Sequence, residues 1–228
     1  MINNIEPIGA IHSPFQQKLG IPRQPGLAQS VESQIIFHPS LAKEETLRGL
    51  ETFTHLWVLY LCHKSESWRE TIRPPRLGGK KKLGVFATRS PHRPNPIGLS
   101  VVKIKSINPD HSITIYGADI LDGSPLLDIK PYLSMWDSIP EANNGWVDNT
   151  PQLEALEVII HPDALQDFNN LDLYTQSIIK ETLRWDPRPA YSKDDGRSFT
   201  HRINHFDITW SKLDESIQIL GIRPGQKK

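Results

Sequence analysis

Prolines and glycines divide the first 130 residues into short apolar runs, and this pattern limits the chain to folds built from short strands. Several runs alternate apolar and polar side chains, as strands with one buried face do. We expect strands at 33–37, 55–63, 83–88, 97–105 and 112–120. Many short strands at this spacing favour a β-barrel or a sandwich. One short helix is expected at 39–49, where Ser40 can cap the first turn and Gly49 can end the helix.

The composition changes between residues 137 and 152, where Pro, Asn, Gly and Asp prevail without periodicity. Beyond this stretch we expect strands at 154–160, 203–210 and 216–220, and one substantial helix at 162–185 that prolines end. The predicted fold class is therefore mainly β with an α+β part. It comprises a small β-barrel domain at 1–137, a linker or long loop at 138–152, and a smaller α+β domain at 153–228.

The charge is distributed unevenly, although the chain has 26 basic and 26 acidic side chains. Residues 69–93 contain eight Lys or Arg and one acid, whereas residues 131–179 contain no Lys or Arg. Such a local excess attracts a polyanion even on a neutral protein. The alternative is a solvated basic loop beside an acidic face, and composition alone leaves both interpretations open.

Length and composition exclude several classes of protein. The chain has 228 residues, of which 37% are hydrophobic, enough to bury a core, and its zero net charge argues against a histone-like protein. No apolar run approaches the ~20 residues of a membrane span, and the N-terminus lacks a signal-peptide pattern. The single cysteine, Cys62, cannot form an intramolecular disulfide. We therefore expect a cytoplasmic protein with no membrane partner.

Common cofactor and hydrolase motifs are missing from the sequence. It contains no Gly-x-Gly-x-x-Gly after a strand, no phosphate loop and no Gly-x-Ser-x-Gly elbow. The histidine pairs in the predicted strands lack Cys or carboxylate partners at ligand spacing, so no metal site is expected.

Residues 84–100 hold the densest group of candidate binding or catalytic residues in the sequence. Three prolines lie within six residues there and stiffen the backbone. A stiff backbone presents polar side chains at low entropic cost, as a preorganised site requires, and this segment carries Arg89, His92, Arg93 and Asn95. The alternative is a rigid structural turn in which the arginines only bind neighbouring carbonyls.

Several long motifs follow one another along the chain: PRQPGL at 22–27, LETFTHLWV at 50–58, RPPRLGG at 73–79, GVFATRSPHRPNP at 84–96, LDGSPLLDIKPYL at 121–133 and DPRPAY at 186–191. In these motifs and in their order the chain resembles the TsaA/TrmO family. The resemblance implies an S-adenosylmethionine-dependent tRNA methyltransferase built on a small β-barrel, with a smaller C-terminal domain, and usually a homodimer. Full-length bacterial members methylate N6 of N6-threonylcarbamoyladenosine at position 37 of threonine tRNA.

The resemblance also implies which residues hold S-adenosylmethionine. Carried over by motif, they are Pro22, Arg23, Gln24, His63, Lys64, Arg89, Leu99, Asp119, Ile120, Leu121, Asp122 and Gly123. Lys64 stands where relatives often carry glutamine.

Methyl transfer from a sulfonium needs in-line alignment more than acid catalysis. The acceptor nitrogen belongs to a urea-like group and is a poor nucleophile until its proton leaves. The candidates for accepting that proton or stabilising the anion are the cationic Arg89 and Arg93, with Asn95 orienting, and Tyr191 from the C-terminal domain. An arginine fork also suits the threonyl carboxylate.

The anticodon stem-loop of tRNA is the expected macromolecular partner. The residues expected to hold its backbone in a salt-dependent way are Arg73, Arg76, Lys80, Lys81 and Lys82. Trp68 or Trp136 can stack a base, although packing inside the protein is the commoner use of a tryptophan. Two other functions stay open: a sensor that binds S-adenosylmethionine or RNA without catalysis, and a methyltransferase for another substrate.

Overall fold

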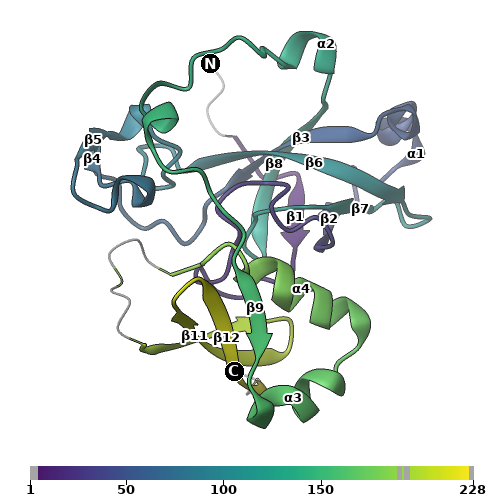
Figure 1. The fold of residues 1–228 in the computed structure, drawn as a ribbon. Coiled ribbons are helices and arrows are strands. Elements are labelled where there is room, and N and C mark those ends of the chain that lie inside the picture. Colours follow the sequence, from purple (N-terminus) through teal and green to yellow (C-terminus); the bar gives the residue numbers. More distant parts are fainter. Residues whose placement is uncertain (1–4, 189–191, 193–195, 226–228) are drawn as a thin grey trace.

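The computed structural model describes residues 5–188, 192 and 196–225. Six antiparallel strands close into a barrel in the order β1-β2-β7-β6-β3-β8, which forms the upper half of the molecule in Figure 1. The strands are β1 (Gly9–His12), β2 (Glu32–Phe37), β3 (His55–Leu61), β6 (Ile97–Ile107), β7 (Ile113–Tyr116) and β8 (Ser124–Pro131). Closure removes every sheet edge, which is the favoured arrangement for many short strands.

Apolar side chains at every second position of the strands point inward and fill the barrel. In β3, Leu56, Val58 and Tyr60 point inward while their neighbours are more exposed. Ile35 from β2 and Leu126 from β8 complete this core, and both are fully buried.

A second sheet lies below the barrel in Figure 1, in the order β10-β11-β12-β9, with β9 parallel to β12. Its strands are β9 (Glu157–Ile160), β10 (Ser198–Ile203), β11 (Phe206–Leu213) and β12 (Ser216–Pro224). The helices α3 (Pro162–Asn169) and α4 (Leu173–Leu183) contribute buried side chains to its core. Phe15, Ala28 and Val31, from the segment between β1 and β2, belong to this second core.

Short strands, single helical turns and 3-10 turns lie in the segments that connect the longer strands. The strands β4 (Thr71–Ile72) and β5 (Leu83–Gly84) form a hairpin at the side of the barrel, and α1 (Glu44–Leu47) and α2 (Ser134–Asp137) are single turns. Turns of 3-10 helix occur at Leu50–Thr52, Pro75–Leu77, Val85–Ala87 and Gly145–Asn149. After α2 the chain passes the β4–β5 hairpin on its way to β9, and Trp146 Nε1 donates to Ala87 O at 2.8 Å on that path (Figure 1).

The predicted fold class is confirmed, since the molecule is mainly β with a barrel and a smaller α+β part. The strand predicted at 83–88 is wrong beyond Gly84, because Thr88 N donates to Val85 O at 3.1 Å and closes a 3-10 turn. The helix predicted at 39–49 begins only at Glu44, because Lys43 is extended, and Ser40 does not cap it.

The single helix predicted at 162–185 is two helices. Asp172 ends the continuity because its carboxylate accepts from Thr175 N at 2.9 Å and caps the start of α4. The strand predicted at 203–210 contains a hairpin turn, because Asn204 has a φ of 50° and Ile203 pairs with Phe206. The strands β1, β8 and β10 were not predicted. In the described part of the chain, no helix has the length and apolar character needed to cross a membrane.

Candidate active site

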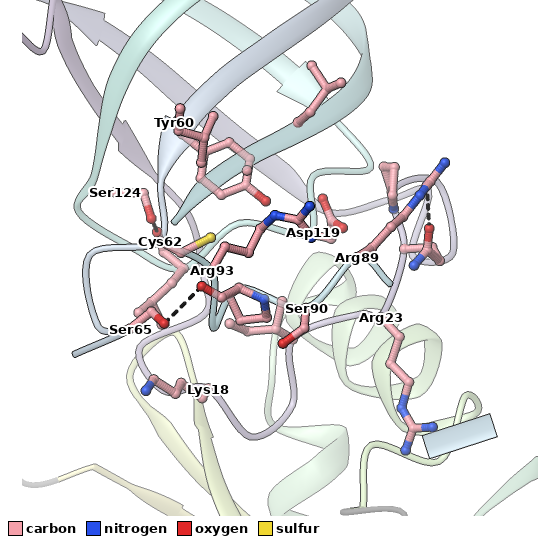
Figure 2. A pocket seen from close by; sticks show the side chains of 18 of the residues that line it. Lys18, Arg23, Tyr60, Cys62, Ser65, Arg89, Ser90, Arg93, Asp119 and Ser124 are labelled. Atoms are coloured by element: carbon pink, nitrogen blue, oxygen red, sulfur yellow. Dashed lines mark hydrogen bonds between the residues drawn. The ribbon is translucent and has the colours of Figure 1, made fainter. Parts of the chain in front are cut away.

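A cavity of about 680 Å³ opens at one end of the barrel, where loops distant in the sequence meet (Figure 2). Its walls come from residues 18–25, from the end of β3 and residues 62–65, from the loop at 88–93, from the start of β6 and from the turn before β8. A cavity of this size suits a ligand of a few tens of atoms.

The loop at 88–93 is held rigidly against the hairpin. Val85 N donates to Glu70 O at 2.9 Å, and Arg93 Nη1 donates to Val85 O at 3.2 Å and to Thr88 O at 2.8 Å. Ser65 Oγ donates to Pro91 O at 2.9 Å and lies 3.3 Å from His92 Nδ1, which gives His92 a structural contact. Arg93 therefore binds neighbouring carbonyls, as in the structural alternative, and also lines the cavity.

The loop at 22–25 is tied to both halves of the molecule. Arg89 Nη1 donates to Gln24 Oε1 at 2.8 Å, and both residues line the cavity. Arg23 Nη2 donates to Asp186 O at 3.1 Å and to Arg188 O at 2.5 Å, and Figure 2 shows its side chain extending away from Tyr60 and Asp119.

Burial and nearby charges shift the pKa of Arg23 in this loop. Burial lowers the pKa of the Arg23 guanidinium, the Asp186 carboxylate opposes this shift, and repulsion from Arg76 adds to it. The β4–β5 hairpin that carries Arg76 therefore lies close enough to the cavity mouth to act on Arg23.

The deep wall of the cavity carries a chain of three polar side chains. Ser100 Oγ donates to Asp119 Oδ1 at 2.5 Å and lies 3.4 Å from Tyr60 Oη. Burial raises the pKa of Asp119 to about 6, against the hydrogen bond from Ser100 and the charge of Arg89. Burial also raises the pKa of Tyr60 and of the Cys62 thiol, so both groups are neutral near pH 7.

The opposite rim carries His63 and Lys64. His63 Nδ1 lies 3.3 Å from Ser124 Oγ, and burial followed by repulsion from Lys64 lowers the pKa of His63, so the ring is neutral near pH 7. Lys18 Nζ donates to Lys64 O at 2.6 Å, which brings a second lysine to the cavity.

Most of the predicted cofactor residues line this one cavity. They are Pro22, Arg23, Gln24, His63, Lys64, Arg89, Leu99, Asp119 and Leu121. The other three predicted cofactor residues do not line the cavity. Ile120 is fully buried in the barrel core, Asp122 Oδ1 accepts from Ser13 N at 3.0 Å, and Gly123 N donates to Ile11 O at 2.9 Å.

The predicted catalytic residues divide in the same way. Arg89 and Arg93 line the cavity, whereas Asn95 is exposed and lies outside its lining. Tyr191 lies outside the described residues.

Sequence reasoning missed several lining residues, among them Lys18, Trp57, Tyr60, Ser65 and Ser124. Tyr60 could have been found, because the alternation at 55–61 makes it the last inward position of a predicted strand. Gly98 marks the same place: a Cβ there would lie 2.2 Å from Tyr60 Cζ, so the ring packs directly on the backbone of β6.

The basic residues lie beside the cavity rather than in it. Arg73, Lys80, Lys81 and Lys82 are exposed in or beside the β4–β5 hairpin, and Arg76 is half-buried. Trp68 is 51% exposed and Trp136 is 70% exposed, so neither is packed in a core. Among the residues that the structure describes, no cluster of three or more His, Cys, Asp or Glu could hold a metal ion.

Comparison with known proteins gives the same family for both halves of the chain. Residues 10–138 match the family described as the tRNA-methyltransferase O N-terminal domain, and residues 153–225 match the TrmO C-terminal domain. A protein of Escherichia coli (strain K12) named tRNA (adenine(37)-N6)-methyltransferase is 38% identical over 96% of this chain and 97% of that protein.

Two further relatives cover the chain almost completely. A Pseudomonas aeruginosa protein named putative S-adenosylmethionine-dependent methyltransferase RcsF is 40% identical over 99% of this chain and 100% of its own length. A crystal structure of TrmO from the same species superposes with a TM-score of 0.80 at 33% identity, covering 99% of this chain and 98% of that one. With both halves matched and full-length relatives above 30% identity, the chain belongs to the TrmO family of tRNA methyltransferases.

Proposed function

We propose that this protein transfers the methyl group of S-adenosylmethionine to N6 of adenosine 37 in tRNA, and that the acceptor carries an N6-threonylcarbamoyl group. One observation supports the threonylcarbamoyl group on the acceptor. Five cationic side chains and a single carboxylate line the described cavity: Lys18, Arg23, Lys64, Arg89 and Arg93, with Asp119. Such a cavity favours an anionic acceptor, and the threonyl group of the modified base supplies a carboxylate.

The cavity also fits the methyl donor. Its volume of about 680 Å³ and its mixture of apolar and polar walls suit an adenosine joined to a charged amino-acid tail. Pro22, Leu99 and Leu121 offer apolar surface, while Gln24 and Arg89, which are hydrogen-bonded to each other, offer polar groups. When bound, S-adenosylmethionine supplies a methyl group on a sulfonium centre. The chain's task is to orient that group and to manage the proton of the acceptor nitrogen.

Arg93 is suited to hold the acceptor because its position is fixed in advance. Its Nη1 donates to two backbone carbonyls, and its guanidinium lies 5.5 Å from the centre of the Phe86 ring. A prepositioned guanidinium stabilises negative charge without reorganising during the reaction. Phe86 itself is 76% exposed, so this edge of the cavity offers an aromatic face to the RNA.

The β4–β5 hairpin is suited to hold the phosphate backbone. Its lysines at 80–82 are exposed, and the charge of Arg76 in the same hairpin reaches Arg23 at the cavity mouth. Contacts to phosphates release counterions, so affinity should fall steeply with salt. Changing all three lysines to alanine should weaken tRNA binding and reduce the magnitude of the salt slope by about 2. An unchanged slope would remove this hairpin from the interface.

The decisive experiment is a methyl-transfer assay with labelled S-adenosylmethionine and bulk tRNA from cells with and without threonylcarbamoyl modification. Label on N6 of the modified adenosine, and its absence from unmodified tRNA, is the expected result. Label on another nucleoside would give the enzyme another substrate. Binding of the methyl donor without transfer to either pool would favour a sensor instead.

Arg93→Ala tests the site within the same assay. Turnover should fall by about 100-fold while the affinity for the methyl donor changes little, because Arg93 is assigned to the acceptor. An unchanged rate would overturn that assignment.

The family resemblance implies a homodimer, and the cysteine content and N-terminal pattern predict a cytoplasmic location. The division at residues 137 and 153 stays a prediction with them. Light scattering on the purified full chain tests the dimer. Limited proteolysis tests the boundaries, because cleavage is expected at exposed residues between 138 and 152.

A further inference from the structure

The deep wall of the cavity holds its only carboxylate among the described lining residues, Asp119. The residue lies in the turn between β7 and β8, directly after a segment fixed by the Gly117 N to Val31 O hydrogen bond of 2.9 Å. Ser100, which is 1% exposed, donates to Asp119 Oδ1 at 2.5 Å from β6. One carboxylate oxygen is thus held from the barrel side, and Figure 2 shows Asp119 beside the cavity between Tyr60 and Arg89.

The charged and titratable groups that face Asp119 come from three elements. Tyr60 on β3 and Cys62 just after it interact with its charge, and Arg89 on the loop at 88–93 favours its ionised form. Burial raises the pKa of Tyr60 and Cys62, so neither loses a proton near pH 7. Among these groups, only Asp119 changes its charge between pH 5 and 7, because its pKa is about 6.

The chemistry of the acceptor requires such a group. N6 of a urea-like nitrogen has a delocalised lone pair and a proton that must leave if the nitrogen is to be methylated. A base is most effective when its pKa lies near the working pH, because it is then mostly ionised and still basic. Arginine at 89 or 93 can stabilise the developing anion, but a guanidinium cannot accept the proton.

We propose that the Asp119 carboxylate accepts the N6 proton of the acceptor adenosine as the methyl group is transferred. This role rests on the proposed function. The N6–H bond breaks and its proton passes to Asp119, while the N6 electron pair forms the new bond to the methyl carbon. The carbon–sulfur electron pair stays on sulfur, which becomes an uncharged thioether, and the proton later leaves Asp119 for water.

Ser100 is the positioning residue in this arrangement. Its hydroxyl holds one carboxylate oxygen and lowers the pKa of Asp119, against the larger effect of burial. Ser100→Ala should therefore raise the pH at which activity appears, while the reaction itself persists.

The competing role for Asp119 is the one implied by the family resemblance, a ligand of the methyl donor. Asp119→Asn separates the two, because asparagine keeps the shape and an acceptor oxygen for Ser100 but cannot take a proton. Affinity for S-adenosylhomocysteine, measured by calorimetry, should stay within about threefold of wild type, whereas single-turnover methylation should fall by about 100-fold or more. Equal losses of affinity and rate would make Asp119 a ligand instead and overturn the proposal.

Two further measurements complete the test. Wild-type single-turnover rates should fall on the acid side with an apparent pKa near 6, and this limb should be lost in the residual activity of Asp119→Asn. Carbon-13 NMR of labelled aspartate in the full chain should show one carboxyl titrating near pH 6 that is missing from Asp119→Asn. An acid limb that survives in Asp119→Asn, or a wild-type protein without this titration, would overturn the proposal.

Asp110→Asn is the matched control. Asp110 also accepts from a serine hydroxyl, Ser112 Oγ at 2.7 Å, but it lies in an exposed turn outside the cavity lining. Its substitution should leave the rate and pH profile unchanged. If wild-type protein methylates no tRNA, the proposed function fails; if it methylates tRNA without an acid limb, only the role of Asp119 fails.

Discussion

The barrel and the second sheet differ in how they complete their cores. Every buried member of the barrel core comes from residues 11–126, whereas the second core takes Phe15, Ala28 and Val31 from the barrel half of the chain. Phe15 even forms an antiparallel bridge to Ile203 of β10. The barrel is therefore self-contained, and the second sheet depends on the segment that joins β1 to β2.

That joining segment has two tasks at once. Phe15, Ala28 and Val31 fill the second core, while residues 18 and 21–25 line the candidate cavity. His201 of β10 packs directly beneath it, since a Cβ on Gly20 would lie 2.2 Å from His201 Cδ2. The second sheet therefore holds one wall of the cavity, so damage to that sheet should reach the cavity.

Phe15→Ala should show the largest effect. Deleting a fully buried phenylalanine costs about 3–5 kcal/mol, because the cavity that it leaves collapses only in part. Hydrogen exchange should quicken in β10, β11 and β12, and the affinity for S-adenosylhomocysteine should fall, while the amides of the barrel core stay protected.

Leu56→Ala is the matched change inside the barrel, where Leu56 is fully buried. It should cost about 2–5 kcal/mol and quicken exchange in the barrel strands. If Phe15→Ala quickened exchange in the barrel as strongly as in the second sheet, the two regions would not differ in the way the cores suggest.

Lowering the pH should change the contributions of the two regions to folding stability with opposite signs. Burial lowers the pKa of His201 to about 4, and its Nδ1 accepts from Trp210 Nε1 at 2.9 Å. The unfolded chain then binds the histidine proton first, so this group's contribution to stability is lost as the pH falls from about 6.5 to 4. Asp119, with a pKa of about 6, binds its proton first in the folded state and contributes stability as the pH falls through the same range.

The two variants should therefore change the slope of stability against pH with opposite signs. His201→Gln should make stability fall more steeply as the pH rises from 4 to 6, and Asp119→Asn should make it rise more steeply, each by up to about 1.4 kcal/mol per pH unit. Urea unfolding at several pH values measures both slopes. Slope changes of the same sign would contradict the assignment of these two pKa shifts.

Local pattern explains what could be predicted from the sequence and where prediction stopped. The run of Val, Leu and aromatic residues at 55–63 predicted β3, which ends at Leu61. Ser198–Ile203 was missed because its polar side chains hide a strand that pairs across the Asn204 turn. The apolar spacing across 162–185 continues through the break between α3 and α4, which a single capping carboxylate on Asp172 creates.

The residues of the cavity could likewise be predicted from the sequence only in part. The proline-stiffened loop and the family motifs predicted Arg89, Gln24 and Asp119 as neighbours in space, and all three line the cavity. The place of Phe15 in the second core could not be predicted, because it depends on a contact between residues 188 positions apart. A sequence pattern reports which face of an element is buried but does not report which distant element covers that face.

The smallest predicted effect comes from two indole hydrogen bonds, one in each region, that fix cavity loops. Trp185 Nε1 donates to Leu27 O at 2.7 Å from the second-sheet half, and Trp146 Nε1 donates to Ala87 O at 2.8 Å beside the barrel. Phenylalanine at either position removes the donor and keeps an aromatic ring.

Trp185→Phe should cost about 1 kcal/mol, because its bond is part-buried and the Leu27 carbonyl loses its partner. Because Leu27 lies two residues after Pro25, the last residue of this segment that lines the cavity, the affinity for S-adenosylhomocysteine should fall about threefold, as calorimetry can measure. Trp146→Phe should change this affinity by less, because its exposed bond can be replaced by water. A larger loss from Trp146→Phe would mean that the barrel side, rather than the second sheet, holds the cavity wall in place.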